Sequence, residues 1–444
     1  MKLKFATSLA LAACLTSVAC LSADAQSKSP KRGIAYDLTN TSDLSALSPG
    51  IGWWYNWGSA PNSGIPGNYA STYGAIYYPM IWDANFSKTT VESFLFAHPE
   101  VKYLLVLNEP NVSGQARCGA VSTGYCRPAD AAALWPQIET IAKDTGVQIV
   151  GPQITYGTDP MYGNPVTWMK AFYSAYESAN GGRQPRIDYL GYHWYDYGLD
   201  GQLTTMAQFN KPFWVTEFAN WHSQNDGAQI DTLAKQEAQM TGMVNDLEGR
   251  GDVLRYSWFT GRVSPDPHFD SLLGATGQLT ALGQQYITMP FTAPPTPVLI
   301  DAGSATAQGK YVADGSFSGG TAASTTNTVT LDSTIDTASQ AVYQSNRYGN
   351  FTYKIGGFAA GSQHIVKLHF AETWWTATGT RLFNVSINGA QVLTNYDIVL
   401  AAGTANKARV ETFSVVVPAS PNNQITVQFT NVKDNAQVNG IEIE

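Results

Sequence analysis

The chain has 444 residues, a formal net charge of −8 and only 14% charged residues. It is too long for one ordinary domain, and its net negative charge would repel phosphate backbones, which argues against a nucleic-acid partner. The low charge and the abundance of aromatic residues (12 Trp, 23 Tyr and 18 Phe) indicate a secreted protein that faces neutral, ring-shaped ligands.

The N-terminus has the pattern of a secretory signal peptide. Two lysines precede an apolar run that ends near Leu21, and a small-x-small cleavage site ends at Ala25. Residues 1–25 are therefore predicted to be removed, which places the mature protein in the periplasm or outside the cell. Residues 11–14 (LAAC) also fit a lipoprotein signal, although this alternative leaves a very short apolar core. No later stretch is long and apolar enough to predict a membrane span.

Residues 32–288 alternate apolar, strand-like runs with helical runs, as expected for a parallel sheet covered by helices. Eight such units in a region of this length predict a (β/α)₈ TIM barrel, which usually has about 250 residues. A doubly wound open sheet is the alternative, but no GxGxxG turn follows the first strand. The predicted strands are 33–36, 51–57, 75–80, 103–107, 148–153, 187–194, 212–217 and 255–259, and the predicted helices include 128–143, 168–178 and 232–247.

The composition changes after the barrel region. Residues 289–297 are proline-rich and predict a short extended linker. Residues 298–444 are rich in Thr, Ser, Gly and Asn, and runs such as VKLHF and LFNVSI alternate apolar and polar side chains, with turns such as Asn388-Gly389 between them. This pattern predicts an antiparallel all-β domain, a sandwich or jelly roll.

Two glutamates follow buried strands of the predicted barrel. Glu109 comes after the fourth strand in VLNEPN, and Glu217 ends the seventh strand in FWVTEFAN. In a TIM barrel the active site lies at the carboxyl ends of the strands, so these side chains are expected to face each other across the mouth. A pair of carboxylates about 5–5.5 Å apart is the arrangement that retaining glycoside hydrolysis requires.

The motifs around these glutamates carry a specific resemblance. GIGWWYNW, YLLVLNEPN, VGPQI, YLGYHWYDY, KPFWVTEFA and SLLGATGQLTALGQQY together resemble glycoside hydrolase family 128, the clan A endo-β-1,3-glucanases with an Asl1-like core. The resemblance covers about residues 32–288. It implies that Glu109 is the general acid/base, that Glu217 is the nucleophile, and that Asn108 holds the 2-hydroxyl of the sugar in the −1 subsite.

Further residues at strand ends are candidates for substrate binding. His193 and Tyr195, at the end of the sixth strand, are expected to hydrogen-bond the nucleophile and hold it ionised, as such groups do in clan A. The alternative for His193 is that it only satisfies nearby backbone groups. Trp258, at the end of the eighth strand, is a candidate for stacking on the sugar, and the alternative is a buried core tryptophan. The remaining rim candidates are Asn56, Trp57, Gln153 and Trp221.

The C-terminal region resembles a malectin-like carbohydrate-binding domain through VYQSNRYGNFTYKI, VKLHFAETWW, LFNVSINGAQVL and KDNAQVNGIEIE. The resemblance covers about residues 297–444. It implies a sugar-binding face formed by Tyr348, Trp374, Trp375 and Asp434. The alternative is that this domain only packs on the barrel.

Cys118 and Cys126 lie in one loop and are expected to form a disulfide in an oxidising compartment. The scattered histidines predict neither a catalytic metal nor a cofactor, and a monomer is expected. The leading hypothesis is therefore a secreted retaining hydrolase of β-1,3-glucan with a sugar-binding module. The alternatives are a non-hydrolytic β-glucan-binding protein and a clan A hydrolase that acts on another polysaccharide.

Overall fold

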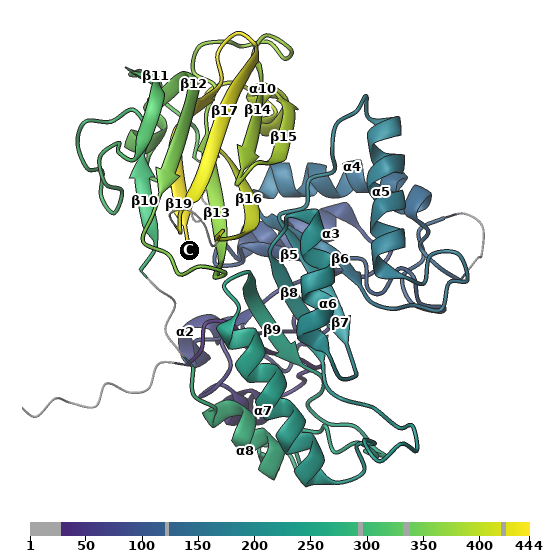
Figure 1. Ribbon diagram of the computed structural model, residues 1–444. Helices are drawn as coiled ribbons and strands as arrows, with labels where there is room; N and C mark the ends of the chain where they lie inside the picture. Colours follow the sequence, from purple (N-terminus) through teal and green to yellow (C-terminus); the bar gives the residue numbers. More distant parts are fainter. Residues whose placement is uncertain (1–27, 120–123, 292–295, 332–337, 419–422) are drawn as a thin grey trace, which may run out of the picture.

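The computed structural model describes residues 28–119, 124–291, 296–331, 338–418 and 423–444 (Figure 1). The predicted signal peptide lies outside these residues, as do residues 292–295 of the predicted linker. Among the helices described, none combines the length and the apolar character that crossing a membrane requires.

The N-terminal region is a ring of parallel strands in the order β3-β2-β1-β9-β8-β7-β6-β5-β4. The two ends of this order, β3 (Ile76–Tyr77) and β4 (Met80–Ile81), are the halves of one predicted strand, separated only by Tyr78 and Pro79. Proline cannot donate to a sheet ladder, which accounts for the break. The ring therefore closes through this segment, and the predicted TIM-barrel class is confirmed.

The remaining barrel strands agree with the predicted ones to within a few residues. They are β1 (Arg32–Ala35), β2 (Trp53–Tyr55), β5 (Tyr103–Val106), β6 (Gln148–Ile154), β7 (Tyr189–Trp194), β8 (Phe213–Phe218) and β9 (Val253–Trp258). The helices are α1 (Thr41–Leu47), α2 (Tyr69–Tyr73), α3 (Lys88–Ala97), α4 (Pro128–Thr145), α5 (Pro165–Ala179), α6 (Leu199–Met206), the 3₁₀ turn η1 (Ala207–Phe209), α7 (Leu233–Gly249) and α8 (Ala281–Thr288).

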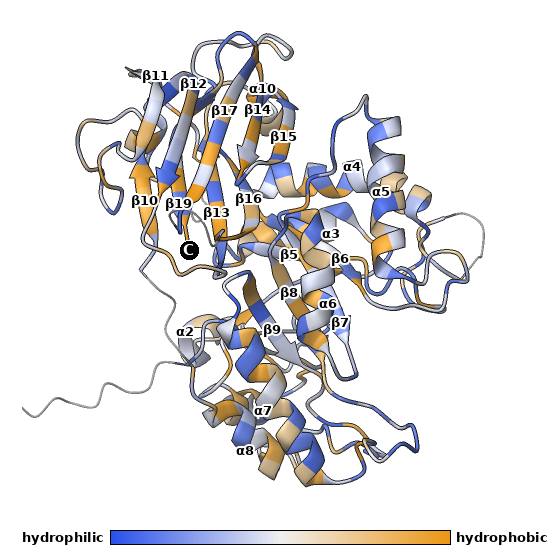
Figure 2. Cartoon of the chain, viewed as in Figure 1, coloured by the Kyte–Doolittle hydropathy of each residue, from blue (hydrophilic) through white to orange (hydrophobic). Residues whose placement is uncertain are grey.

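Local sequence signals account for several helix ends. Helix α4 begins with Pro128, whose missing N–H costs nothing in the first turn, and stops before Gly146, which has a φ of 81°. Helix α5 follows Asn164, whose side chain accepts a hydrogen bond from the Thr167 N–H. In Figure 2, helix α7 carries both hydrophobic and hydrophilic residues, as expected for a helix with one buried face.

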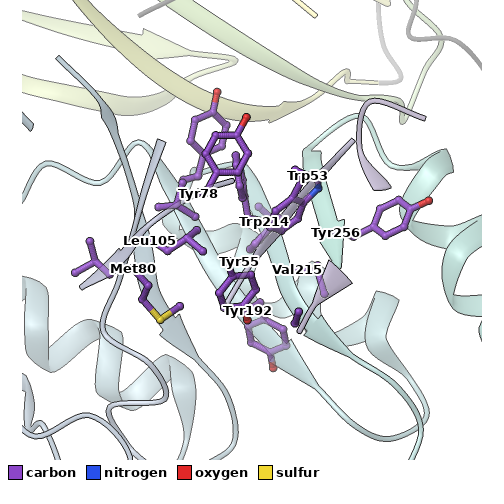
Figure 3. Close-up of a cluster of buried hydrophobic side chains, with 14 of the residues drawn as sticks. Trp53, Tyr55, Tyr78, Met80, Leu105, Tyr192, Trp214, Val215 and Tyr256 are labelled. Atoms are coloured by element: carbon purple, nitrogen blue, oxygen red, sulfur yellow. The ribbon is translucent and has the colours of Figure 1, made fainter. Parts of the chain in front are cut away.

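Aromatic side chains fill the barrel interior (Figure 3). The Trp214 ring lies 5.0 Å from the Trp53 ring, 5.2 Å from the Tyr78 ring and 4.7 Å from the Tyr103 ring. Trp54 points outward from the same strand as Trp53 and contacts Tyr69 of α2. Much of the aromatic content is therefore core, and strand β2 alternates between inside and outside as expected for a period of two.

The C-terminal region is a sandwich of two antiparallel sheets, which confirms the predicted all-β class. One sheet has the order β10-β19-β13-β16, and the other has the order β11-β12-β17-β14-β15, with β18 paired to β12. The elements are β10 (Val298–Asp301), β11 (Phe317–Ser324), α9 (Gln340–Tyr343), β12 (Ser345–Ile355), β13 (Gln363–Phe370), β14 (Leu382–Ile387), β15 (Ala390–Tyr396), α10 (Ile398–Ala402), β16 (Arg409–Val416), β17 (Ile425–Lys433), β18 (Gln437–Val438) and β19 (Gly440–Ile443).

The sandwich packs on the amino-terminal end of the barrel strands (Figure 1). Just before β8, the Lys211 ammonium donates to the Thr412 carbonyl (3.4 Å), and the Ser414 N–H donates to the Asn210 carbonyl (3.2 Å). Just before β9, a Cβ on Gly251 would lie 1.7 Å from the Gln363 carbonyl oxygen, so only glycine fits there. The sandwich thus covers the end of the barrel opposite the carboxyl ends of the strands.

Candidate active site

Glu109 and Glu217 lie at the carboxyl end of the barrel, on strands separated by β6 and β7. The chain leaves β5 with Leu107 and Glu109 in the left-handed region (φ of 57° and 45°), and the Glu109 N–H donates to the Gln153 carbonyl (2.9 Å). This turn carries the Glu109 side chain over the barrel mouth. Glu217 is the next-to-last residue of β8 and is 4% exposed.

One carboxylate oxygen of Glu109, one of Glu217 and a ring nitrogen of His193 all lie within 4.8 Å of one another. The nearest carboxylate oxygens are thus no more than 4.8 Å apart, which is compatible with the carboxyl separation of about 5–5.5 Å in retaining glycosidases and below the 6.5–9.5 Å of inverting ones. The two carboxyl groups therefore lie close together at the mouth of the barrel.

Glu217 is held by hydrogen bonds on both oxygens. Oε1 accepts from the Tyr55 hydroxyl (2.9 Å) and from the Trp57 indole N–H (2.8 Å). Oε2 accepts from the Tyr195 hydroxyl and lies 3.3 Å from His193 Nδ1. The pKa of Glu217 is raised overall, chiefly by burial and also by the charge of Glu109, while the charge of His193 and the hydrogen bonds from Tyr195 and Trp57 act in the opposite direction. These donors stabilise the ionised form in a site that otherwise disfavours charge.

His193 connects the two glutamates. Its Nδ1 lies 2.9 Å from Glu109 Oε1, and its Nε2 lies 3.0 Å from the Thr216 hydroxyl oxygen. The ring is completely buried. Burial lowers the pKa of His193, but the charges of Glu217 and Glu109 outweigh this effect, so the pKa is raised overall. The ring nitrogen Nδ1 thus hydrogen-bonds Glu109 and lies within ion-pair distance of Glu217 (3.3 Å).

Asn108, directly before Glu109, is buried in the wall of the site (4% exposed). Its amide nitrogen donates to Gln115 (3.0 Å), and its Oδ1 has no hydrogen-bond partner among the described residues. This oxygen is buried, so it is an unpaired acceptor within the part of the protein that the structure describes, which is costly.

Two predicted substrate-binding residues do not reach the open site. Trp258 is fully buried, its ring packs against Phe218 (5.1 Å), and its indole N–H donates to the Asp270 carbonyl (2.8 Å). Gln153 is also fully buried, and its amide bonds to Val150 and Thr216. The predictions that these side chains contact substrate are therefore wrong, because both point into the core beneath the site.

The next residue, Phe259, takes the place expected for Trp258. Its ring lies 5.9 Å from Trp57, 5.6 Å from Tyr195 and 5.5 Å from Trp221. Trp221 is 36% exposed and stacks on Tyr195 with ring centroids 4.0 Å apart. Together these rings form an aromatic wall beside Glu217. The sequence predicted Trp258 rather than the adjacent Phe259, and Tyr55 was not among the predicted site residues.

Hydrogen bonds hold the side chains of the predicted rim residues Trp221 and Asn56 in place. The Trp221 indole N–H donates to Asp270 (2.9 Å), where burial raises the carboxyl pKa to about 7. Asn56 holds the loop after β2, since its Oδ1 accepts from the Tyr77 hydroxyl (2.5 Å) and from the Gly58 N–H (3.1 Å). Exposed aromatics on neighbouring loops are Tyr156, Tyr197 and Phe269.

A disulfide links Cys118 to Cys126 in the loop that follows Glu109. The Cys126 N–H donates to the Pro110 carbonyl (2.9 Å), and the Ala116 N–H donates to the Asn108 carbonyl (3.0 Å). The loop thus folds back on the segment that carries Glu109, and the bridge restricts it. A disulfide is expected in an oxidising compartment.

The four predicted ligand residues of the sandwich lie far from the glutamates in sequence, on the C-terminal domain. Trp374 is 77% exposed and Trp375 is 36% exposed, so both neighbouring rings reach solvent. The Trp375 indole N–H donates to Asp434 Oδ2 (2.6 Å). Tyr348 lies opposite Gln437 in the β12–β18 pairing. Gln437 is three residues after Asp434 in the sequence. The structure thus brings Trp375 and Asp434 together and places Tyr348 on the adjoining strand.

A TIM barrel with two facing glutamates at its mouth and an aromatic wall beside them has the architecture of a glycoside hydrolase. The family model described as glycosyl hydrolase catalytic core matches residues 33–286, and the malectin domain model matches residues 298–441. The chain belongs to this glycosyl hydrolase family.

Solved structures and one curated protein resemble the barrel. The chain is 52% identical to a GH128 (subgroup II) endo-β-1,3-glucanase from Pseudomonas viridiflava, over 60% of this chain and 100% of that one, with a TM-score of 0.58. It is 32% identical to the corresponding enzyme from Sorangium cellulosum, over 59% of this chain and 100% of that one, with a TM-score of 0.50.

The curated relative is alkali-sensitive linkage protein 1 of Schizosaccharomyces pombe, which is 28% identical over 275 residues. The match covers 59% of this chain but only 45% of that protein, so the chain spans less than half of the curated relative.

Proposed function

We propose that this protein hydrolyses β-1,3-glucan by double displacement. A Glu217 oxygen attacks the anomeric carbon while Glu109 gives its proton to the leaving glycosidic oxygen, and a covalent glycosyl-enzyme forms. Glu109 then takes a proton from water, the water oxygen attacks the same carbon, and Glu217 leaves. Each half-reaction inverts the anomeric carbon, so the overall configuration is retained.

The observation that carries this proposal is the meeting of the two carboxyl groups with His193 within 4.8 Å. The hydrogen-bond donors around Glu217 suit the nucleophile, because they hold it in place and favour its ionised form. The β-1,3 linkage is supported by the two GH128 endo-β-1,3-glucanases that resemble the barrel over their full length.

Product analysis tests this function. Curdlan, laminarin, xylan and β-1,4-glucan are incubated with equal amounts of protein, and new reducing ends are counted. We expect reducing ends from the two β-1,3-glucans at rates well above those from the others. Binding to curdlan without new reducing ends would instead support a non-hydrolytic receptor. Faster release of reducing ends from xylan or β-1,4-glucan would contradict the proposal that β-1,3-glucan is the substrate.

We also propose that the sandwich binds sugar through Trp374 and Trp375. Flat rings stack on the apolar faces of sugars, and Asp434 provides acceptors for hydroxyl groups beside them. Trp374 is among the most exposed large apolar residues described and makes no ring contact with a neighbour there, which suits a ring that packs against a ligand.

Trp374→Ala is expected to weaken retention on insoluble curdlan by roughly tenfold, the effect of losing about one stacking contact. Turnover of a soluble oligosaccharide should not change, because Trp374 lies on the sandwich rather than at the barrel mouth. Pull-down with curdlan measures retention, and Phe96→Ala is the matched control, since Phe96 is an exposed ring on barrel helix α3. Equal retention of both variants would contradict this role.

A further inference from the structure

The catalytic glutamates rest on a buried chain of hydrogen bonds that lies beneath them. It runs from His193 Nε2 to the Thr216 hydroxyl (3.0 Å) and from that hydroxyl to Gln153 Oε1 (2.5 Å). Gln153, His193 and Thr216 are each fully buried. None of these three polar groups can rely on bulk water, so each must satisfy its hydrogen bonds within the chain.

The direction of each bond follows from the Gln153 amide. Its nitrogen lies 2.6 Å from the Val150 carbonyl, which can only accept, so this atom is the NH₂ group and the oxygen faces Thr216. The amide oxygen can also only accept. The single hydroxyl hydrogen of Thr216 must therefore point to Gln153, which leaves a lone pair of the hydroxyl oxygen facing His193. His193 Nε2 must then carry a hydrogen.

The other ring nitrogen faces acceptors as well. His193 Nδ1 lies 2.9 Å from Glu109 Oε1 and 3.3 Å from Glu217 Oε2. Glu217 is ionised as the nucleophile and can only accept, and Glu109 Oε1 can accept in either state of Glu109, because the acid proton can be carried by Oε2. Nδ1 therefore also donates. The other titratable groups near this cluster are Tyr195 and Tyr55, and both hydroxyls donate to Glu217.

Glycines beside Gln153 leave room for its side chain amide. A Cβ on Gly191, which lies opposite Gln153 in the β6–β7 pairing, would come 1.9 Å from Gln153 Oε1. A Cβ on Gly151 would come 3.3 Å from Gln153 Nε2 and 2.5 Å from the Val106 carbonyl oxygen. The register of β6 against β7 also shifts between Val150 and Gln153. Two glycines and a bulge thus form a slot for this side chain.

We infer that Gln153 and Thr216 are positioning residues that keep both ring nitrogens of His193 protonated between the two glutamates. The resulting imidazolium supplies a positive charge that favours ionised Glu217, and it lies within proton-transfer distance of Glu109. The inference deepens the proposed function and rests on it for the catalytic consequence. The protonation state itself depends only on the hydrogen-bond geometry.

Nitrogen-15 NMR of the histidine-labelled full chain measures the protonation state directly. The His193 signals are those that disappear in His193→Asn. At neutral pH we expect both His193 nitrogens to have the chemical shifts of protonated imidazolium. A signal of one unprotonated ring nitrogen at this pH would overturn the inference, whether or not the protein cleaves glucan.

The pH profile of kcat/KM tests the catalytic consequence. In Thr216→Val, Nε2 loses its acceptor, so the imidazolium becomes less favourable and the alkaline limb should move to lower pH by about one unit. Loss of that charge also disfavours ionised Glu217, so the acidic limb should move to higher pH. Thr216→Ser keeps the hydroxyl and should restore the wild-type profile.

Gln153→Leu separates this role from general packing. Without the amide oxygen, the Thr216 hydroxyl is free to donate to Nε2, which then favours a neutral ring although Thr216 is intact. We expect the same narrowing of the pH profile and the appearance of an unprotonated Nε2 signal. A lower rate with unmoved limbs in both Thr216→Val and Gln153→Leu would mean a structural role only and would contradict the inference. Absence of any glucan cleavage by the wild type would remove the proposed function, while the NMR result would still decide the protonation state.

Discussion

Glu217→Ala is expected to lower the rate of glucan hydrolysis by at least about 10⁴-fold, as loss of a covalent nucleophile does in other enzymes. Glu217 lies at the end of β8, and both of its oxygens are aligned by donors from Tyr55, Trp57 and Tyr195. Without the carboxylate there is no group in place to attack the anomeric carbon. Initial rates of reducing-end release from laminarin provide the measurement.

Azide rescue of Glu217→Ala provides a second test of the nucleophile role, in which activity is gained rather than lost. The alanine leaves space beside the anomeric carbon, so added azide should restore turnover of an aryl β-1,3-glucan oligosaccharide and give the α-glycosyl azide. Thermal unfolding checks that the fold is intact, and Glu237→Gln on the outer helix α7 is the matched control for removal of a carboxylate. Wild-type activity of Glu217→Ala would refute its assignment as nucleophile.

Glu109→Gln is expected to lower the rate on laminarin on the order of 10²–10⁴-fold, the usual contribution of a general acid/base. The amide is nearly isosteric and cannot protonate the glycosidic oxygen. Glycosides with dinitrophenolate leaving groups need no such proton, so formation of the glycosyl-enzyme from them should be little impaired. Rates on both substrate types, measured side by side, test this role.

The contrast between the two substrates is the decisive feature of that prediction. An equal loss on laminarin and on the dinitrophenyl glycoside would mean that Glu109 positions the substrate or maintains the site, and it would contradict the acid role. His193 contacts Glu109 (2.9 Å), so the unfolding temperature of Glu109→Gln must be compared with that of the wild type.

The sequence predicted the barrel because its strands are continuous apolar runs whose ends carry polar side chains. Such runs indicate buried parallel strands, and Glu109 and Glu217 stand out because each interrupts one of these patterns at the carboxyl end. The alternation within WWYNW also contained a usable signal. Tyr55 and Trp57 are two positions apart, the spacing of residues on one face of a strand, and both donate to Glu217.

The errors arose where the backbone departs from regular alternation. Register shifts occur between Val150 and Gln153 in the β6–β7 pairing and between Val215 and Phe218 in the β8–β9 pairing. Each shift changes which side chains point into the site, so Gln153 turns into the core and Phe259 rather than Trp258 joins the aromatic wall. A period of two cannot reveal such shifts, because they depend on how neighbouring strands pair.

The arrangement of the two domains also lay beyond sequence reasoning. A proline-rich segment predicted a linker, but contacts such as Lys211 with Thr412 and Gly251 against Gln363 depend on surfaces that only the folded chain brings together. Through these contacts the sandwich covers the amino-terminal end of the barrel strands, and the carboxyl end with the two glutamates stays uncovered by it.

The configuration of the first product tests the central claim most directly, because it reports whether both carboxyl groups act on one anomeric carbon by double displacement. Proton NMR of laminarin hydrolysis, recorded within the first minutes and before mutarotation, shows which anomer is released. The account predicts that new reducing ends appear first as the β anomer and that the α anomer grows only later. Initial release of the α anomer would mean a single displacement by water and would contradict the account.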